Sequence, residues 1–189
     1  KNFPSLEGLV HIINNSPASA LIFEDKKNLW GKDHFFERVG SVNYKVSIES
    51  FFQVNRFLSL TLYEKAARYA SLSGGETVLD LYCGSGGVGL FVADSAQQVV
   101  GVEENPQAVE DAKFNAWLNG RNNFNCIPGR VDKMLPLFSN VGVDVVIVDP
   151  PRAGLDKKVV RRVSSLSPQR LVYISCNINF SIKKSHVIT

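Results

Sequence analysis

The sequence predicts an α/β fold in which helices cover both faces of a mostly parallel sheet. From about residue 51, short apolar runs alternate with segments of helical periodicity, which is the pattern of parallel strands joined by crossover helices. The runs are almost continuously apolar, as in strands that are buried on both faces. A glycine-rich turn at residues 84–89 follows the first of them. We therefore expect a Rossmann-like sheet that binds a ligand at the carboxyl ends of its strands.

Two regions differ in composition. Residues 1–50 contain short apolar runs broken by Asn, Ser, Pro, Gly and Lys, and they predict a small antiparallel β region. Its predicted strands lie at residues 9–13, 20–23 and 42–48, with turns at 14–17 and 25–28. Residues 51–189 form the second region, with predicted strands at 77–82, 99–102, 124–127, 143–148 and 171–175.

The helices of the second region are predicted between these strands, at residues 57–70, through 90–93, from 106 to about 119, and at 157–164. Asn105 is suited to cap the third helix because its side chain can accept hydrogen bonds from free backbone N–H groups. Pro106 is favourable in the first turn, and Gly120 is a typical residue just past the end of a helix.

The overall composition is that of a folded soluble protein. Of the 189 residues 44% are apolar and 21% are charged, and the net charge is +3, which is compatible with a nucleic acid partner without requiring one. Neither a membrane span of 18 apolar residues nor a signal peptide is expected. Three widely spaced cysteines, Cys83, Cys126 and Cys176, predict no disulfide framework, no metal site and a reducing, cytoplasmic location.

The glycine-rich turn, Gly84-Ser-Gly-Gly-Val-Gly89, fits two kinds of cofactor. It can hold the pyrophosphate of a dinucleotide, or lie under the amino-acid part of S-adenosylmethionine, with Gly84 and Gly86 against the cofactor. Glu103, at the end of the next strand, can accept hydrogen bonds from ribose hydroxyls in either case. Asp80 favours S-adenosylmethionine, because a carboxylate beside the turn would repel a pyrophosphate and attract an ammonium group.

Two residues after later strands suggest the chemistry. Cys176 ends the last predicted strand, and a thiolate there could add to carbon 6 of a pyrimidine, which makes carbon 5 nucleophilic. Arg152, in the rigid turn Asp149-Pro-Pro-Arg152, is a candidate to lower the pKa of that thiol. A cysteine after a strand is also a common small buried residue, and an arginine in a turn is commonly only solvated.

Five segments in this order resemble the S-adenosylmethionine-dependent RNA 5-methyluridine methyltransferases. They are Ser50-Phe-Phe-Gln-Val-Asn55, Val78-Leu-Asp-Leu-Tyr-Cys-Gly-Ser-Gly86, Gly101-Val-Glu103, Asp149-Pro-Pro-Arg-Ala-Gly154 and Ser175-Cys-Asn177. The resemblance implies a class I methyltransferase fold and an RNA partner, either tRNA or rRNA. It also implies that Gln53, Tyr82, Glu103 and Asp149 contact the cofactor, and that Cys176 is the nucleophile toward uracil.

The sequence also departs from that family. Ile178 stands where members usually have Pro, and the chain ends at Thr189, before the glutamate that is the family's general base. We therefore expect a chain shortened at both ends, without the last strands of the sheet, that binds cofactor with little turnover. An uncovered sheet edge predicts edge-to-edge dimers. The alternatives are a non-catalytic remnant that binds S-adenosylmethionine or RNA, and a nicotinamide-dependent oxidoreductase.

Overall fold

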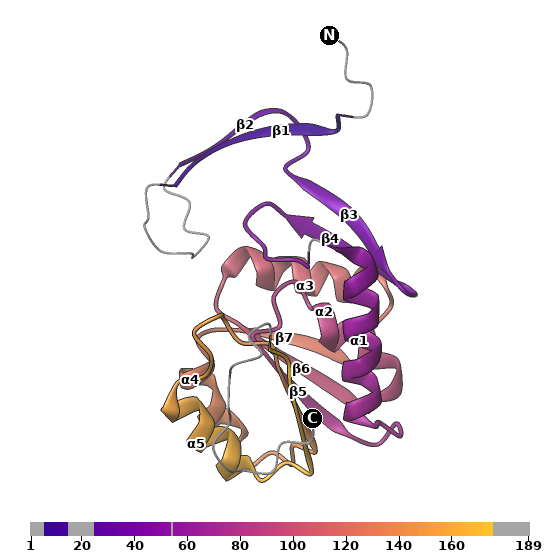
Figure 1. Ribbon diagram of the computed structural model, residues 1–189, viewed down its shortest axis with the longest axis vertical. Helices are drawn as coiled ribbons and strands as arrows, with labels where there is room; N and C mark the ends of the chain where they lie inside the picture. The colour runs from indigo at the N-terminus through magenta and orange to yellow at the C-terminus, as the bar shows by residue number, and fades with distance from the viewer. Residues whose placement is uncertain (1–5, 15–24, 54, 176–189) are drawn as a thin grey trace.

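The central sheet has five parallel strands in the order β7-β6-β5-β8-β9 (Figure 1). The computed structural model describes residues 6–14, 25–53 and 55–175. The strands are β5 (Thr77–Leu81), β6 (Gln98–Glu103), β7 (Phe124–Pro128), β8 (Val145–Val148) and β9 (Arg170–Tyr173). The chain enters this sheet at its middle strand, β5, and continues outward through β6 and β7. It then crosses to the other side of β5 and forms β8 and β9. The strand order therefore reverses between β5 and β8, and the predicted Rossmann-like sheet is confirmed.

Helices cover both faces of this sheet. One face packs against α1 (Arg56–Ala70), α2 (Gly87–Val92) with the short η1 (Ala93–Ser95), and α3 (Pro106–Leu118). The other face packs against α4 (Val131–Met134), η2 (Leu135–Phe138) and α5 (Lys157–Leu166). Successive strand residues alternate between the two cores, so that Val78 faces the first and Leu79 the second. This alternation explains why the strands read as continuous apolar runs in the sequence.

Two antiparallel hairpins precede the sheet. The first pairs β1 (Gly8–Ile13) with β2 (Asp25–Gly31), and the second pairs β3 (His34–Val39) with β4 (Val42–Ser47). In Figure 1 the first hairpin lies farthest from the sheet, and β4 lies along α3. Val42, Tyr44 and Val46 of β4 are buried in the same core as α1, α2 and α3. The division of the chain near residue 50 stays a prediction, because the second hairpin shares the core of the sheet.

Most predicted elements are present in the structure, but a predicted turn is wrong and several elements were not predicted. The turn predicted at residues 25–28 is wrong, because these residues belong to β2 and pair with β1. Their polar composition resembles a turn, but a strand of an exposed ribbon can form on main-chain hydrogen bonds without an apolar face. The strand β3, the short helix α4 and the 3-10 helix η2 were not predicted. The strand predicted at 20–23 lies outside the described residues.

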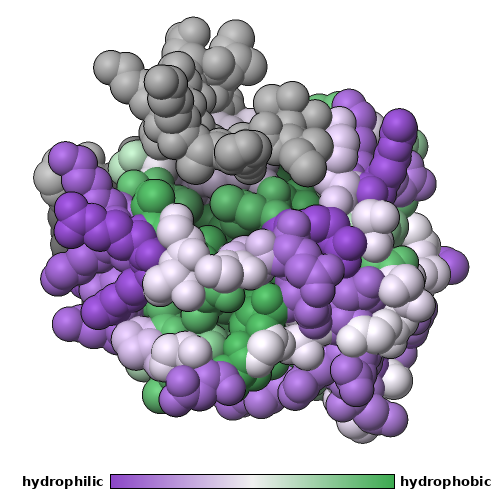
Figure 2. Space-filling model, turned by 90° about the horizontal axis from the view of Figure 1, so that it is seen from below, coloured by the Kyte–Doolittle hydropathy of each residue, from purple (hydrophilic) through white to green (hydrophobic). Residues whose placement is uncertain are grey.

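The face at the end of the molecule opposite the first hairpin has a hydrophobic centre. Figure 2 shows these apolar residues between hydrophilic side chains on both sides. Strand β9 is an edge of the five-stranded sheet in the part of the chain that the structure describes. Across residues 6–14, 25–53 and 55–175, no helix combines the length and the apolar character needed to span a membrane.

Candidate active site

A pocket opens at the carboxyl ends of β5 and β8, where the strand order reverses. It encloses about 380 Å³, including open solvent at its mouth. Its walls come from the segment at residues 51–53, from Tyr63 of α1, from the chain between β5 and α2, and from Asp149 after β8. Ligands of open α/β sheets bind at this position, so the pocket is the candidate active site.

The glycines of the loop before α2 and of the start of α2 meet specific geometric requirements. Gly86 has a φ of 90°, which favours glycine, and it caps the start of α2. The backbone N–H of Gly89 donates a hydrogen bond to Asp80 Oδ2 at 2.8 Å. A Cβ atom on Gly89 would lie 2.6 Å from that oxygen and 2.8 Å from a ring carbon of Phe124. The glycine at position 89 therefore lets α2 approach the middle strand closely.

Asp80 supplies a buried carboxyl group at the base of the pocket. Its side chain lies in the middle strand, and the residue is only 2% exposed. Burial raises the pKa of Asp80 to about 8, against the opposing hydrogen bond from Gly89, and the nearby charges of Asp149 and Glu103 raise it further. A carboxyl group held this way is mostly protonated at neutral pH, and a cation placed beside it would favour its ionised form.

Asp149 adds a second carboxyl group to the pocket wall. Burial raises the pKa of Asp149 to about 6, although a hydrogen bond from the Gln53 side chain opposes the shift. This contact joins the segment before α1 to the end of β8 across the pocket. Among the described residues that line the pocket there is no Lys, Arg or His. The lining is therefore suited to a positively charged ligand and unsuited to a pyrophosphate.

Glu103 fixes the glycine loop at the end of β6. One carboxylate oxygen accepts a hydrogen bond from Gly84 N–H at 3.0 Å, and the other accepts one from Asn105 N–H at 2.8 Å. A carboxylate has about four acceptor positions, so both oxygens retain capacity for hydroxyl donors. Glu103 is partly exposed, beside the pocket rather than among the residues that line it.

The turn after β5 has an unusual backbone. Tyr82 has a φ of 63°, a left-handed conformation that is uncommon for a residue other than glycine. It directs the chain from the strand into the loop, and the half-buried ring lines the pocket. Burial raises the pKa of Tyr82, so its hydroxyl stays protonated.

Cys83 is buried beneath the loop and is not placed as a nucleophile. Its Sγ lies 3.6 Å from Cys126 Sγ, across the side-chain-free Gly101 of β6. A hydrogen bond with Cys126 and burial raise the pKa of the Cys83 thiol well above its usual range. A thiol that is held protonated is a poor nucleophile.

The structure brings most of the predicted site residues together. Those lining the pocket are Gln53, Asp80, Tyr82, Gly84 and Asp149, while Gly86 and Glu103 adjoin it. Arg152 is exposed in the turn after β8, apart from the lining, and Cys176 lies outside the described residues. Sequence reasoning missed Tyr63, which reaches the pocket only because α1 packs beside α2. Within the described ranges, no three His, Cys, Asp or Glu residues are grouped to hold a metal ion.

Comparison with known proteins places this chain in a family. The family model described as a methyltransferase domain matches residues 72–187. The chain belongs to the methyltransferase domain family. The match begins just before β5 and includes the glycine loop, Glu103 and Asp149, so it covers most of the candidate site. Membership agrees with the class I methyltransferase fold predicted from the motifs, and with S-adenosylmethionine as the kind of cofactor.

Individual relatives confirm the resemblance to RNA methyltransferases. The chain is 37% identical to a protein of Oceanobacillus iheyensis named as an uncharacterized RNA methyltransferase, over 94% of the chain and 39% of that protein. A protein of the same name from Staphylococcus aureus MSSA476 is 40% identical over 93% of the chain. The chain therefore spans about two fifths of the length of these relatives.

A solved structure is similar as well. It is that of the Pyrococcus abyssi tRNA (uracil-54, C5)-methyltransferase in complex with S-adenosyl-L-homocysteine. The two share 33% sequence identity with a TM-score of 0.70, over 88% of this chain and 40% of the other. The five-stranded sheet and its helices make up less than the 88% of the chain that this similarity covers. The similarity therefore also includes residues that precede the sheet.

Proposed function

We propose that the pocket binds S-adenosylmethionine and that the domain is the cofactor-binding part of an RNA methyltransferase. The observation that carries this proposal is the acidic lining of a glycine-loop pocket. Asp80 and Asp149 line it, Glu103 adjoins it, and no cationic side chain among the described lining residues could neutralise a pyrophosphate. A nicotinamide dinucleotide would place its negatively charged pyrophosphate at this loop. S-adenosylmethionine would instead place a positively charged sulfonium and an ammonium group there.

Each acidic residue has a distinct part in this proposal. S-adenosylmethionine supplies an electrophilic methyl group. Asp80 would pair with the ammonium group, and Glu103 would accept hydrogen bonds from the ribose hydroxyls while it holds Gly84 in place. Gln53 and Asp149, joined across the pocket, would bind the cofactor from the side of α1 and β8. Tyr82 would contribute its ring as a wall.

The proposed substrate is a uridine in RNA, either tRNA or rRNA. Support comes from the names of the relatives and from the motif around Cys176, which resembles the family's nucleophile segment. The Cys176 thiolate would form a bond to carbon 6 of uracil. The electron pair displaced to carbon 5 would attack the methyl group of S-adenosylmethionine, whose bond to the sulfonium sulfur would break to release S-adenosyl-L-homocysteine. A base would then remove the proton from carbon 5 as the bond between Cys176 Sγ and carbon 6 breaks, which frees the thiolate. Arg152 would lower the pKa of the thiol.

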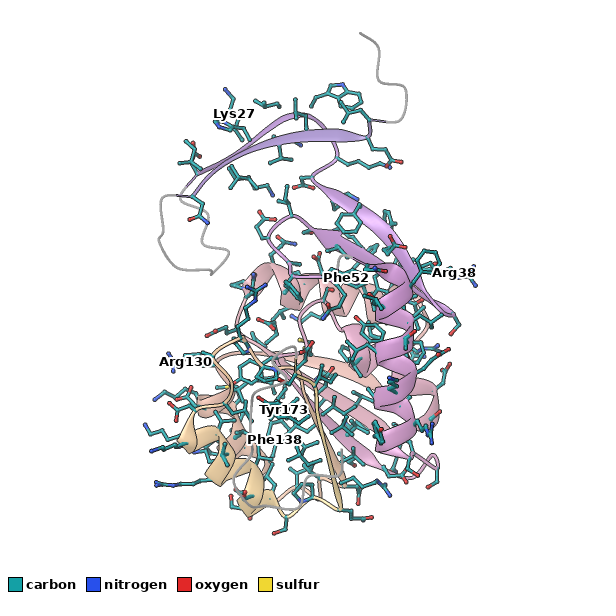
Figure 3. The ribbon with its side chains drawn as sticks, in the orientation of Figure 1. Lys27, Arg38, Phe52, Arg130, Phe138 and Tyr173 are labelled. Atoms are coloured by element: carbon teal, nitrogen blue, oxygen red, sulfur yellow. The ribbon has the colours of Figure 1, made fainter. Side chains whose placement is uncertain are left out.

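The surface of α4 and α5 is suited to the RNA backbone. Val159 and Val163 of α5 are buried against the sheet. The basic side chains of this helix are Lys157, Lys158, Arg161 and Arg162. Lys133 extends this charge onto α4, which packs against α5. Arg130 directly precedes α4 and is paired with Asp132 at 3.0 Å (Figure 3). Arg130 and Asp132 both interact electrostatically with Tyr82, so the basic surface lies next to the pocket. The proposed location is the cytoplasm, where such RNA is found.

Mass spectrometry tests the proposed reaction. The chain is incubated with S-adenosylmethionine and an RNA containing 5-fluorouridine, which cannot lose a proton from carbon 5 after methylation. We expect a methylated covalent adduct that is lost in Cys176→Ala and retained in Cys126→Ala, whose side chain is buried in the core. Cofactor binding without an adduct would contradict catalysis by this chain and favour the non-catalytic remnant.

A further inference from the structure

A row of polar side chains on α3 binds the free backbone edge of β4. The row consists of Asp111, Asn115 and Asn119, four residues apart along the helix, and is called here the α3 polar ladder. β4 pairs with β3 on one edge only, and its other edge faces α3. Four helical residues rise by about 6 Å and two strand residues by about 6.7 Å, so three successive contacts stay nearly in register.

The ladder contacts imitate the hydrogen bonds of a neighbouring strand. Asn119 Oδ1 accepts from Asn43 N–H at 2.9 Å, and its amide donates to Asn43 C=O at 2.7 Å. Asn115 makes the same pair with Lys45, at 2.7 and 2.9 Å. At the third position Asp111 Oδ2 accepts from the backbone N–H of residue 47 at 2.8 Å. The edge of β4 is thereby satisfied without a further strand.

Asn115 also reaches the glycine loop. The second hydrogen of its amide donates to Ser85 C=O at 3.0 Å, while the first binds Lys45 C=O. Beside it, the buried Tyr44 hydroxyl donates to Gly87 C=O at 2.7 Å. Asn115 is fully buried, so these hydrogen bonds are shielded from water. β4, α3 and the loop are therefore joined at one side chain.

Asp111 holds the other wall of the pocket. Its Oδ2 accepts from Ser50 Oγ at 2.6 Å, and its Oδ1 accepts from Ser47 Oγ at 2.8 Å. Lys45 Nζ lies 3.4 Å from the same carboxylate and balances its charge. Ser50 directly precedes residues 51–53, which line the pocket. The backbone carbonyl of Phe51 comes within 3.6 Å of where a Cβ on Gly84 would lie.

We propose that Asp111 and Asn115 are positioning residues, which set the segment at residues 50–53 and the glycine loop at the distance that the cofactor requires. This inference rests on the proposed function, because the ligand is the proposed S-adenosylmethionine. Neither residue lines the pocket, so both act through Ser50 and Ser85. Asn119 makes the same two contacts with β4 and none with the loop, so its role is limited to holding the hairpin.

Matched variants separate an effect on the position of the pocket walls from an effect on the stability of the fold. Ser50→Ala removes the hydrogen bond to Asp111 and keeps every contact between the ladder and the β4 backbone. Asn119→Ala removes a ladder residue whose hydrogen bonds go to Asn43 and Asn115 and not to the loop. We expect Ser50→Ala to weaken S-adenosyl-L-homocysteine binding about tenfold, equal to about 1.4 kcal/mol, with little change in Tm. We expect Asn119→Ala to lower Tm and leave the affinity within twofold. Equal affinities for wild type and Ser50→Ala, or affinity losses that follow Tm in both variants, would overturn the proposal.

Amide hydrogen exchange tests the same point without ligand. The two variants Asn115→Ala and Asn119→Ala are compared at denaturant concentrations that give them the same free energy of unfolding. We expect the backbone amides of the peptide that contains Ser85 and Gly87 to exchange about tenfold faster in Asn115→Ala than in Asn119→Ala. Equal exchange rates would contradict the positioning role. A wild-type chain that binds no S-adenosyl-L-homocysteine, but shows the expected exchange difference, would contradict the proposed cofactor and leave the coupling of α3 to the loop established.

Discussion

Burial of the Asp80 carboxyl group makes proton release a measurable consequence of cofactor binding. With a pKa of about 8, roughly 0.9 of the Asp80 side chains carry a proton at pH 7. A ligand ammonium beside this group favours the ionised form, so binding should release close to one proton per ligand. Asp149, with a pKa of about 6, is protonated in only about a tenth of the molecules at pH 7 and adds little.

Calorimetry in two buffers measures this release. The apparent enthalpy of S-adenosyl-L-homocysteine binding at pH 7 is compared in phosphate and in Tris, which differ in ionisation enthalpy. We expect a difference that corresponds to about 0.9 proton per ligand, as the fraction of protonated Asp80 requires. In Asp80→Asn, which keeps an acceptor for Gly89 N–H, we expect almost no buffer dependence. The same proton release in wild type and Asp80→Asn would refute the assignment of Asp80 to the ammonium group.

The same group predicts how stability depends on pH in the absence of ligand. The pKa of Asp80 is higher in the folded chain than in the unfolded chain, so the folded state binds more protons between about pH 4 and pH 8. The contribution of Asp80 to the free energy of unfolding is therefore greatest at low pH and is lost as the pH rises through this window. The loss is on the order of 5 kcal/mol. Urea unfolding of wild type and Asp80→Asn across the window measures it, and parallel curves would contradict the reasoning.

Three further predictions concern packing, capping and charge. Gly101→Ala should lower the free energy of unfolding by about 1–3 kcal/mol in urea, because its Cβ would lie 2.6 Å from Cys83 Sγ, whereas Gly142→Ala, with open space around it, should not. Asn105→Ala should cost about 0.5–2 kcal/mol by the same measurement, since its side chain caps α3; an unchanged unfolding midpoint would contradict this. Lys158→Ala should reduce the salt dependence of RNA binding by about one counterion, and an unchanged slope in a filter-binding assay would exclude this surface from the RNA contact.

Much of the site could be predicted from the sequence because its signals are local. A strand followed by a glycine-rich turn and a helix places Asp80 and the loop at the carboxyl ends of the sheet strands. This placement does not depend on how the rest of the chain folds. Asn105 before Pro106 was predicted as a helix cap on the same local grounds, and its side chain accepts hydrogen bonds from two backbone N–H groups of α3.

Other features depend on contacts between distant segments, which a single sequence does not reveal. The residues of the α3 polar ladder recur every four positions, and this pattern is indistinguishable in sequence from a solvated helix face. It becomes informative only once β4 lies along α3, about 70 residues earlier in the chain. Likewise, the approach of Cys83 to Cys126 requires the β5-β6-β7 order and the absence of a side chain at Gly101.

Edge-to-edge dimers, expected from an uncovered strand, stay a prediction. β9 is an edge strand within the described part of the chain, and its neighbour on the inner side is β8. Sedimentation equilibrium of the chain at increasing concentration measures association. Weight-average masses that rise toward twice the 20.9 kDa of the chain are expected, and a constant monomer mass would contradict the dimer.

Direct titration with cofactors tests the central claim, that the acidic pocket binds S-adenosylmethionine rather than a dinucleotide. The wild-type chain is titrated by calorimetry with S-adenosyl-L-homocysteine and, in a separate experiment, with NADH. We expect saturable one-to-one binding of S-adenosyl-L-homocysteine, weakened in Asp80→Asn. We expect no binding of NADH, because its pyrophosphate would meet the Asp149 carboxylate and no cationic side chain among the described lining residues. Binding of NADH in preference to S-adenosyl-L-homocysteine would contradict the claim.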